Sequence, residues 1–263
     1  MNEPVSPQTL RARKRLGEPI AGLTAYDYPT AVLVDRAGLD LVLVGDSLGQ
    51  LILGRARAEE TTMEDMIHHC SAVGRGVVRA MLVGDMPFGS YEITPALAVE
   101  NAIRLVKDGG VAAVKLEGGA EVAPAVRAVS AAHVTVIGHL SPAHVAGVLT
   151  EADEAQALID AARALEDAGA AAVVLVGLAL ETARAVTVSL RTIPSIGFRS
   201  GPHCDGQLLV TPYMLGLTPP HNPLPGPYGA LGDQLMETFT RFREDVYGRT
   251  MRESGIPEDP PNT

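Results

Sequence analysis

Eight short apolar runs, each followed by a longer stretch with helical periodicity, constrain the fold of this 263-residue chain more than any other feature. Most of the runs are spaced by about 25 to 40 residues, which is typical of strand–helix–strand crossovers. The runs are Ile20–Tyr26, Asp40–Asp46, Met81–Asp85, Ala112–Glu117, Val134–His139, Ala172–Val176, Ser195–Phe198 and Leu208–Thr211. We therefore predict eight strands that alternate with helices.

The composition of these runs predicts a parallel sheet. They are apolar throughout instead of alternating between apolar and polar residues, as expected for parallel strands covered on both faces. Eight such units in one domain predict an α/β fold, namely a (β/α)8 barrel, with an open doubly wound sheet as the alternative. No Gly-x-Gly-x-x-Gly motif follows any run, so the usual dinucleotide reason for an open sheet is missing.

The whole chain, residues 1–263, is predicted to form a single barrel domain, because α/β barrels of this length commonly form one unit. Residues 218–232, TPPHNPLPGPYGALG, are too rich in proline and glycine for a helix or a strand and predict a loop. Residues 233–248 predict a C-terminal helix, and we expect the tail at residues 254–263 to be disordered.

Composition and charge argue against several classes of function. The formal net charge of −10 is unfavourable for binding nucleic acid, and the one basic cluster, Arg11–Arg15, is expected on a solvated helix face. The N-terminus has no apolar signal segment, and the longest apolar run, Ala168–Leu180, is too short to cross a membrane. Two distant cysteines without disulfide or zinc spacing fit a reducing compartment, so we expect a cytoplasmic protein.

Charged residues end several of the predicted strands. Asp46 and Asp85 close two apolar runs in the similar stretches LVLVGDSLG and MLVGDMPFG, and Glu117 and His139 close the next two. Lys115 lies two residues before Glu117 and therefore faces the same side of its strand. Side chains at the C-terminal strand ends of a barrel share one mouth, where barrel enzymes have their active sites. We therefore predict one shared site.

Three converging acids favour a metal site. Without a cation, Asp46, Asp85 and Glu117 would raise each other's pKa values, and a hard divalent ion removes that repulsion. Carboxylate oxygens favour Mg²⁺ or Ca²⁺ over zinc, and few carboxylates with open positions are typical of Mg²⁺. The alternative is that each aspartate only caps a helix or forms a turn. Lys115 within an apolar strand indicates a nearby anion, whereas His139 could also be a hydrogen-bonded core residue.

Several motifs together resemble the ketopantoate hydroxymethyltransferase family in order and spacing. They are TAYDYPTA, LVGDSLG, TMEDMIHH, GDMPFGSY, VKLEGG, IGHL, IPSIGF, GPHCDGQLLV and LGLTP, between Thr24 and Pro219. The resemblance implies a (β/α)8 barrel of the phosphoenolpyruvate/pyruvate-like superfamily type, assembled as a homo-oligomer, usually a decamer. It also implies Mg²⁺ as cofactor, with transfer of a one-carbon unit from 5,10-methylenetetrahydrofolate to the enolate of a 2-oxo acid.

The resemblance also implies roles for individual residues. The metal ligands would be Asp46 and Asp85, which bind directly, and Glu117, which binds through water. The residues that would hold the 2-oxo acid are Ser47, Lys115 and His139, together with the two aspartates. Lys115 and His139 are the predicted catalytic residues, and Lys115 would add positive charge where the enolate forms.

This chain departs from the family pattern in three places. Val176 stands where the family has a catalytic glutamate at the end of the sixth strand. Arg199 and Ser200 replace small residues after the seventh strand, and a guanidinium there suits a second anionic group on the substrate. Arg199 could instead be an ordinary solvent-facing loop residue. The segment after His139 is shorter than in the family and lacks its Gly-Tyr-Lys loop.

Val176 cannot replace the general base that the family's glutamate supplies. General base catalysis typically contributes about 10²- to 10⁴-fold in rate, so activity requires another group to act as the base. Candidate replacements are a metal-bound hydroxide, His139, Lys115 with a lowered pKa, and His203. The leading hypothesis is a Mg²⁺-dependent, hydroxymethyltransferase-like enzyme acting on 2-oxoisovalerate or a relative with an extra anionic group. The alternatives are a lyase or hydrolase that splits a C–C bond in a 2-oxo acid, and a barrel that binds a ligand without catalysis.

Overall fold

The computed structural model describes residues 3–145, 150–217 and 228–249. Residues 218–227 of the predicted loop and the predicted disordered tail at 254–263 lie outside these ranges. The chain divides into two compact units, Met1–Leu209 and Val210–Thr263. All predicted strands up to the seventh, and every predicted site residue, belong to the first unit.

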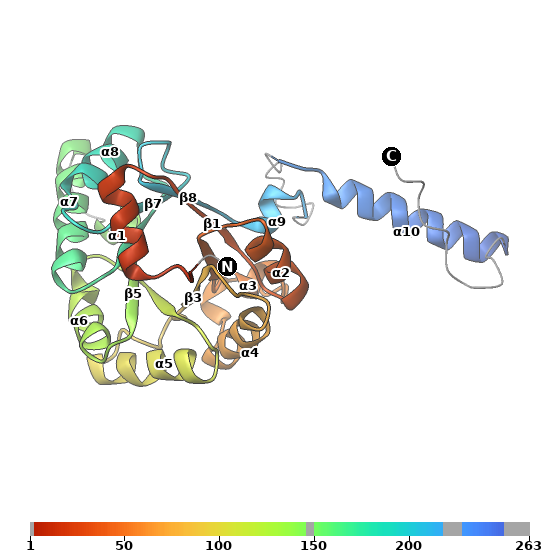
Figure 1. The fold of residues 1–263 in the computed structure, drawn as a ribbon, viewed down its shortest axis with the longest axis horizontal. Coiled ribbons are helices and arrows are strands. Elements are labelled where there is room, and N and C mark those ends of the chain that lie inside the picture. Colours follow the sequence, from red (N-terminus) through yellow and green to blue (C-terminus); the bar gives the residue numbers. More distant parts are fainter. Residues whose placement is uncertain (1–2, 146–149, 218–227, 250–263) are drawn as a thin grey trace. The chain divides into compact units, whose positions relative to one another are not determined.

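The first unit contains a closed barrel of eight parallel strands, in which β8 pairs with β1 (Figure 1). The strands are β1 Ile20–Thr24, β2 Leu41–Val44, β3 Met81–Asp85, β4 Ala113–Glu117, β5 Thr135–Leu140, β6 Ala172–Val176, β7 Ser195–Phe198 and β8 Gly206–Leu209. The predicted (β/α)8 barrel is therefore confirmed, and the alternative of an open doubly wound sheet is wrong. Closure gives every one of these strands two hydrogen-bonded neighbours.

The eighth strand lies earlier in the chain than predicted. The apolar residues of this segment predict a strand at Leu208–Thr211. In the structure β8 runs over Gly206–Leu209, and Thr211 begins the next helix. Pairing with β1 sets this register, because Ile20 lies opposite Gly206. A side-chain carbon at Gly206 would come within 2.4 Å of the Ile20 carbonyl oxygen, so only glycine fits where the barrel closes.

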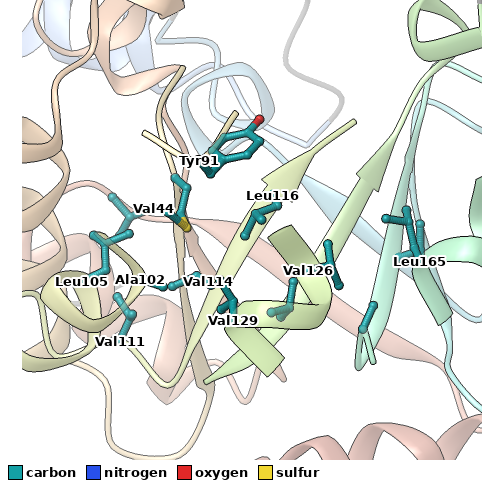
Figure 2. Close-up of a cluster of buried hydrophobic side chains, with 14 of the residues drawn as sticks. Val44, Tyr91, Ala102, Leu105, Val111, Val114, Leu116, Val126, Val129 and Leu165 are labelled. Carbon is teal, nitrogen blue, oxygen red and sulfur yellow. The ribbon is translucent and has the colours of Figure 1, made fainter. Parts of the chain in front are cut away.

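Helices surround the strands in Figure 1. Those that follow strands are α2 Tyr28–Arg36, α3 Leu48–Leu51, α4 Met63–Gly74, α5 Pro95–Lys107, α6 Ala123–Ala131, α7 Glu151–Asp167 and α8 Leu180–Ser189, with 3-10 turns η1 Ala58–Glu60, η2 Ala120–Val122 and η3 Pro142–Val145. Their apolar faces form an outer core with the strands, in which Leu105, Val129 and Leu165 are fully buried. Figure 2 shows part of this core, including Val114 on β4.

A second group of apolar side chains fills the inside of the barrel. It joins Ile20, Leu41 and Met81, the first residues of their strands, to Leu10 of helix α1, Pro7–Leu16. Leu10 is fully buried, and α1 lies across one end of the barrel in Figure 1. Helix α1 therefore closes the N-terminal end of the strands, which leaves the C-terminal end available for a site.

The second unit contains helices α9, Thr211–Met214, and α10, Leu231–Gly248. Helix α10 begins slightly before the range predicted for the C-terminal helix. Several of its large apolar side chains are exposed, among them Phe239 and Phe242. Within the described ranges of the chain, no helix combines the length and the hydropathy needed to span a bilayer.

Candidate active site

The C-terminal strand ends bring five of the predicted site residues together. Asp85 at the end of β3 lies opposite Lys115 of β4, and Glu117 at the end of β4 lies opposite His139 of β5. Asp46 follows β2, and its backbone N–H donates to Oδ2 of Asp85 at 3.1 Å. The five residues form one cluster at the open end of the barrel.

Asp85 is the most buried acid of this cluster, with 4% of its surface exposed. Lys115 Nζ lies 3.1 Å from Oδ1 of Asp85. The contact is an ion pair without hydrogen-bond alignment, because Oδ1 accepts no hydrogen bond from the described residues. Burial raises the pKa of Asp85 to about 7, although the charge of Lys115 opposes the rise. Burial also raises the pKa of Asp46, so a cation would stabilise both carboxylates.

Lys115 remains a cation despite its burial. Loss of water around an ammonium group lowers its pKa, but the charges of Asp85, Asp46 and Glu117 outweigh that effect. The pKa of Lys115 consequently lies above its ordinary value. The raised pKa does not favour Lys115 as a base in the metal-free arrangement of charges. Lys115 instead supplies a positive charge beside both aspartates.

Two histidines hold the carboxylate of Glu117. Nδ1 of His139 lies 3.0 Å from Oε2, and Nε2 of His144 lies 3.2 Å from Oε1. The Tyr91 hydroxyl donates to the Glu117 carbonyl at 2.8 Å and accepts its backbone N–H at 3.2 Å. Burial alone would raise the pKa of Glu117, but the hydrogen bonds from His139 and His144 hold it well below its usual range. Glu117 is therefore a carboxylate that is restrained at both its backbone and its side chain.

His139 is neutral near pH 7, since burial and the positive charge of Lys115 lower its pKa to about 4. Its Nδ1 lies between Lys115 Nζ, at 3.2 Å, and Oε2 of Glu117, at 3.0 Å. The Lys115 ammonium can only donate and the Glu117 carboxylate can only accept, so the two contacts favour different tautomers of His139. Nε2 is buried and has no hydrogen-bond partner in the described part of the chain.

The loop after β2 places Ser47 beside the acids. The Tyr26 hydroxyl and Ser47 Oγ share a hydrogen bond of 3.1 Å, and the Thr61 hydroxyl donates to the Asp46 carbonyl at 2.7 Å. A side-chain carbon at Gly49 would come within 2.3 Å of Thr61 Oγ1, so the close approach of these segments requires glycine. These contacts hold Asp46 and Ser47 in place before any ligand binds.

A cavity of about 710 Å³ opens from the cluster, and it is strongly negative. The charged residues that line it are Asp46, Glu59, Asp85, Glu92, Lys115, Glu117 and Glu121. Lys115 is the single lysine or arginine among the described residues of the lining. His144 and the aromatic side chains of Phe88 and Tyr91 also line it. The cavity therefore suits a cation more readily than a second anion.

The aspartate pair fits a divalent metal better than the predicted set of three acids does. In residues 3–145, 150–217 and 228–249, no three His, Cys, Asp or Glu side chains are arranged to hold a metal. Both carboxylate oxygens of Glu117 already contact histidines. Oδ1 of Asp85, in contrast, lies 3.1 Å from the Lys115 ammonium but accepts no aligned hydrogen bond from the described residues, and Mg²⁺ prefers carboxylate oxygens. Asp46 and Asp85 could therefore bind a metal directly.

The residues that depart from the family pattern lie elsewhere. Val176 ends β6 and packs against the apolar core inside the barrel, and it has no group that can move a proton. Arg199 follows β7 with a φ of 54° and is not part of the cavity lining. His203 is exposed between β7 and β8. Neither Arg199 nor His203 joins the cluster, and their roles stay predictions.

Ser200, next to Arg199, has a structural role in this arrangement. It is fully buried, and its hydroxyl donates to the Leu175 carbonyl at 2.8 Å and accepts the Leu178 backbone N–H at 3.1 Å. Ser200 thus ties the loop after β6 to the loop after β7, next to the position of Val176.

Sequence reasoning missed three residues that support the site, namely His144, Tyr26 and Tyr91. Tyr26 is the last residue of the first predicted strand, and Tyr91 and His144 follow closely on predicted strand ends, which in a barrel lie near the mouth. The two tyrosines belong to the motifs TAYDYPTA and GDMPFGSY. His144 lies in the shortened segment after His139. A titratable residue in a loop at the barrel mouth could have indicated that His144 belongs to the site.

Comparisons with known proteins were made for the whole chain. The family model described as ketopantoate hydroxymethyltransferase matches residues 4–252. A 3-methyl-2-oxobutanoate hydroxymethyltransferase of Thermoanaerobacter sp. (strain X514) is 47% identical over 231 residues, which cover 85% of this chain and 84% of the relative.

Solved structures with a similar fold are more distant in sequence. Phosphonopyruvate hydrolase in complex with oxalate and Mg²⁺ has a TM-score of 0.64 at 18% identity, over 96% of this chain and 91% of the other. The 2,3-dimethylmalate lyase, a PEP mutase/isocitrate lyase superfamily member, has a TM-score of 0.60 at 18% identity, over 97% and 90% of the two chains. These likenesses show the fold alone, a barrel of the predicted kind.

Proposed function

The chain belongs to the ketopantoate hydroxymethyltransferase family, and from this premise we propose that it adds a one-carbon unit to a 2-oxo acid in a Mg²⁺-dependent reaction. The observation that carries the proposal is the pair of Asp46, which is half-buried, and Asp85, which is buried, beside Lys115. Burial raises the pKa values of both aspartates, so a divalent cation would stabilise their charged forms.

Asp46 and Asp85 would hold the metal, since carboxylate oxygens are the ligands that Mg²⁺ prefers. The phosphonopyruvate hydrolase that shares this fold was solved with oxalate and Mg²⁺, which supports the same type of site here. When bound, Mg²⁺ would stabilise the negative charge that develops on the keto oxygen as the enolate forms. Glu117 would add its charge from outside the direct ligands, because His139 and His144 hold its carboxylate.

The side chains around the aspartates would bind and orient the substrate. Lys115 keeps its positive charge and would attract the carboxylate of the 2-oxo acid. Ser47, held by Tyr26, would offer a hydroxyl donor at the same end of the barrel. We propose His139, which is neutral at pH 7, as the group that accepts the proton that Val176 cannot take. This role requires the tautomer with the proton on Nδ1, and it requires the substrate to reach Nε2, which is buried outside the cavity lining.

The cavity has room for the ring end of a second substrate, which we propose to be 5,10-methylenetetrahydrofolate, with its anionic glutamate tail outside the acidic lining. Its volume of about 710 Å³ exceeds what a small branched oxo acid fills and lies within the usual range for small-molecule sites. Phe88 lines it and is 68% exposed, which offers an aromatic face for a planar ring.

The charge of the cavity bears on the choice of 2-oxo acid. Its acidic lining would repel a second anionic group, which favours 2-oxoisovalerate or another substrate with an uncharged side chain. A more anionic relative would require Arg199, which lies outside the lining. Parallel assays with 2-oxoisovalerate and 2-oxoglutarate distinguish the two possibilities, and we expect the first to be preferred.

The test of the proposed function is exchange of the C3 proton. 2-Oxoisovalerate is incubated with the protein and Mg²⁺ in D₂O without folate, and the C3 proton signal is followed by NMR. We expect the signal to disappear only when protein and Mg²⁺ are both present. Addition of 5,10-methylenetetrahydrofolate should then yield ketopantoate.

Other results of this experiment would favour other functions. Exchange that persists after removal of the metal with EDTA would contradict the metal site. Absence of exchange with a broad panel of 2-oxo acids would contradict enolate chemistry and favour a binding role without catalysis. Cleavage of a C–C bond in a member of the panel, without folate, would favour the lyase or hydrolase alternative.

A further inference from the structure

His144 contacts an acid of the site but is not among the groups proposed to bind the metal or the substrate. It lies on the 3-10 turn η3 after β5, its side chain is 14% exposed, and it lines the cavity. We propose that His144 is a positioning residue that, together with His139, holds the carboxylate of Glu117 away from the aspartate pair. An effect of His144 on Mg²⁺ affinity rests on the proposed function. The positioning of Glu117 by His144 does not depend on that function.

The hydrogen bonds of His144 determine which ring nitrogen carries the proton. The backbone N–H of Ser141 donates to Nδ1 at 3.0 Å, so Nδ1 is an acceptor. Nε2 of the neutral ring therefore carries the proton and donates it to Oε1 of Glu117 at 3.2 Å. The backbone of η3 thus orients the imidazole, and the imidazole orients the carboxylate.

His139 holds the other oxygen of the same carboxylate. Its Nδ1 lies 3.0 Å from Oε2 of Glu117. The rings of His139 and His144 meet edge to face, with centroids 5.7 Å apart and planes at 79°. The Tyr91 hydroxyl meanwhile bonds both backbone groups of Glu117. The carboxylate cannot rotate without breaking at least one of these bonds.

This arrangement fixes the place of the Glu117 charge relative to Asp46 and Asp85. No three-residue ligand set exists among the described His, Cys, Asp and Glu side chains, and each oxygen of Glu117 has a histidine partner. Without His144, Oε1 would lose its donor, and the charge of Glu117 would no longer lie at a fixed place. Loss of groups that orient a metal site in this way typically costs about 10- to 100-fold in metal affinity or activity.

Two variants separate the hydrogen bond of His144 from its packing. His144→Phe keeps a ring but removes the donor, whereas His144→Gln keeps an N–H donor. His68, an exposed histidine on α4, provides the matched controls His68→Phe and His68→Gln.

The first measurement is ring-nitrogen NMR of the metal-free protein. We expect the Nε2–H tautomer for His144. The ring signals of His139 should shift in His144→Phe, because Glu117 loosens, and return toward wild type in His144→Gln. Signals of His139 that are identical in wild type and His144→Phe would overturn the proposal.

The second measurement is calorimetric binding of Mg²⁺ alone. We expect His144→Phe to bind Mg²⁺ about tenfold more weakly, with most of the affinity recovered in His144→Gln and none lost in the His68 variants. Equal affinities in wild type and His144→Phe would overturn the effect of His144 on the metal. A wild-type protein that binds no Mg²⁺ would contradict the proposed function, while the NMR result would still decide the role of His144.

Discussion

Individual acids of the site differ in charge state because their immediate partners differ. Asp85 has an ion pair but no aligned donor on Oδ1, and burial raises its pKa to about 7. Glu117 receives two imidazole contacts, and its pKa lies well below the usual range. A cation would therefore stabilise Asp85 far more than Glu117.

Replacement of Asp85 by Asn should remove Mg²⁺ binding while leaving the shape of the side chain nearly unchanged. Because metal catalysis supplies several kcal/mol, we expect C3 proton exchange to slow by about two orders of magnitude or more. Calorimetry with Mg²⁺ and NMR in D₂O measure the two effects. Asp108→Asn, at the exposed end of α5, is the matched control. An Asp85→Asn protein with undiminished Mg²⁺ affinity would show that the metal binds elsewhere.

Substitution of Val176 by Glu should raise the rate of ketopantoate formation, by up to about 10²- to 10⁴-fold if only the base is missing. The side chain ends β6 on the inner side of the barrel, so a carboxylate there would lie at the open end. Val176→Gln has nearly the same size but no basic group and serves as control. Equal rates for the Glu and Gln variants would show that the new carboxylate does not act as a base.

At the scale of elements, a carboxylate far from the site connects a helix to a later strand. Glu166, near the end of α7, accepts the backbone N–H groups of Arg191 at 3.1 Å and Thr192 at 2.7 Å, and the Thr192 hydroxyl at 2.9 Å. Arg191 and Thr192 lie just before β7. Glu166 therefore holds together two segments that the strand β6 and helix α8 separate in the chain.

The bonds of Glu166 should make stability depend on pH in the acid range. Burial would raise the pKa of Glu166, but hydrogen bonds from Arg191 and Thr192 lower it from 4.5 to about 2. Because the pKa is lower in the folded protein, the stabilisation is complete above the unfolded value and declines as the pH falls toward 2. Glu166→Gln should therefore cost roughly 1 to 3 kcal/mol at neutral pH and less in acid.

Urea denaturation at pH 7 and at acid pH measures this difference. Glu151→Gln, at the exposed first position of α7, should change the free energy of unfolding little at either pH. A loss for Glu166→Gln that is independent of pH would contradict the argument from its lowered pKa.

At the scale of the whole molecule, the two ends of the barrel have separate tasks. Helix α1 closes the N-terminal end with Leu10, and the charged cluster occupies the C-terminal end. The N-terminal strand ends therefore contribute to the stability of the barrel, and the C-terminal ends carry the candidate active site, as is usual in such barrels. Assembly into a homo-oligomer remains a prediction from the family resemblance.

Removal of the Leu10 side chain should therefore destabilise the protein without changing the chemistry of the site. Leu10 is fully buried, so Leu10→Ala should cost about 2 to 5 kcal/mol in the free energy of unfolding, measured with urea. Leu16 ends the same helix with 64% of its surface exposed, and Leu16→Ala is the matched control. A large loss of Mg²⁺ affinity in folded Leu10→Ala protein would contradict this separation of tasks.

The order and number of strands could be predicted from the sequence because each strand buried on both faces needs its own apolar run. Three strands, β3, β6 and β7, have the predicted bounds. The position of β8 could not be predicted, because it depends on closure against β1, and this pairing joins Gly206 to Ile20 from opposite ends of the barrel sequence. The amino-acid sequence around Gly206 carries no information about such a long-range contact.

The sequence by itself determined which acids meet at the mouth, since Asp46, Asp85 and Glu117 end successive parallel strands and the C-terminal ends of such strands lie together. Only the tertiary structure decided what each acid does there. It paired Glu117 with His139 and His144, placed Lys115 beside Oδ1 of Asp85, and kept Lys115 charged. The physical reason is that position along a strand follows from the spacing of residues, whereas partners, burial and pKa values depend on side chains that only folding brings within a few ångströms.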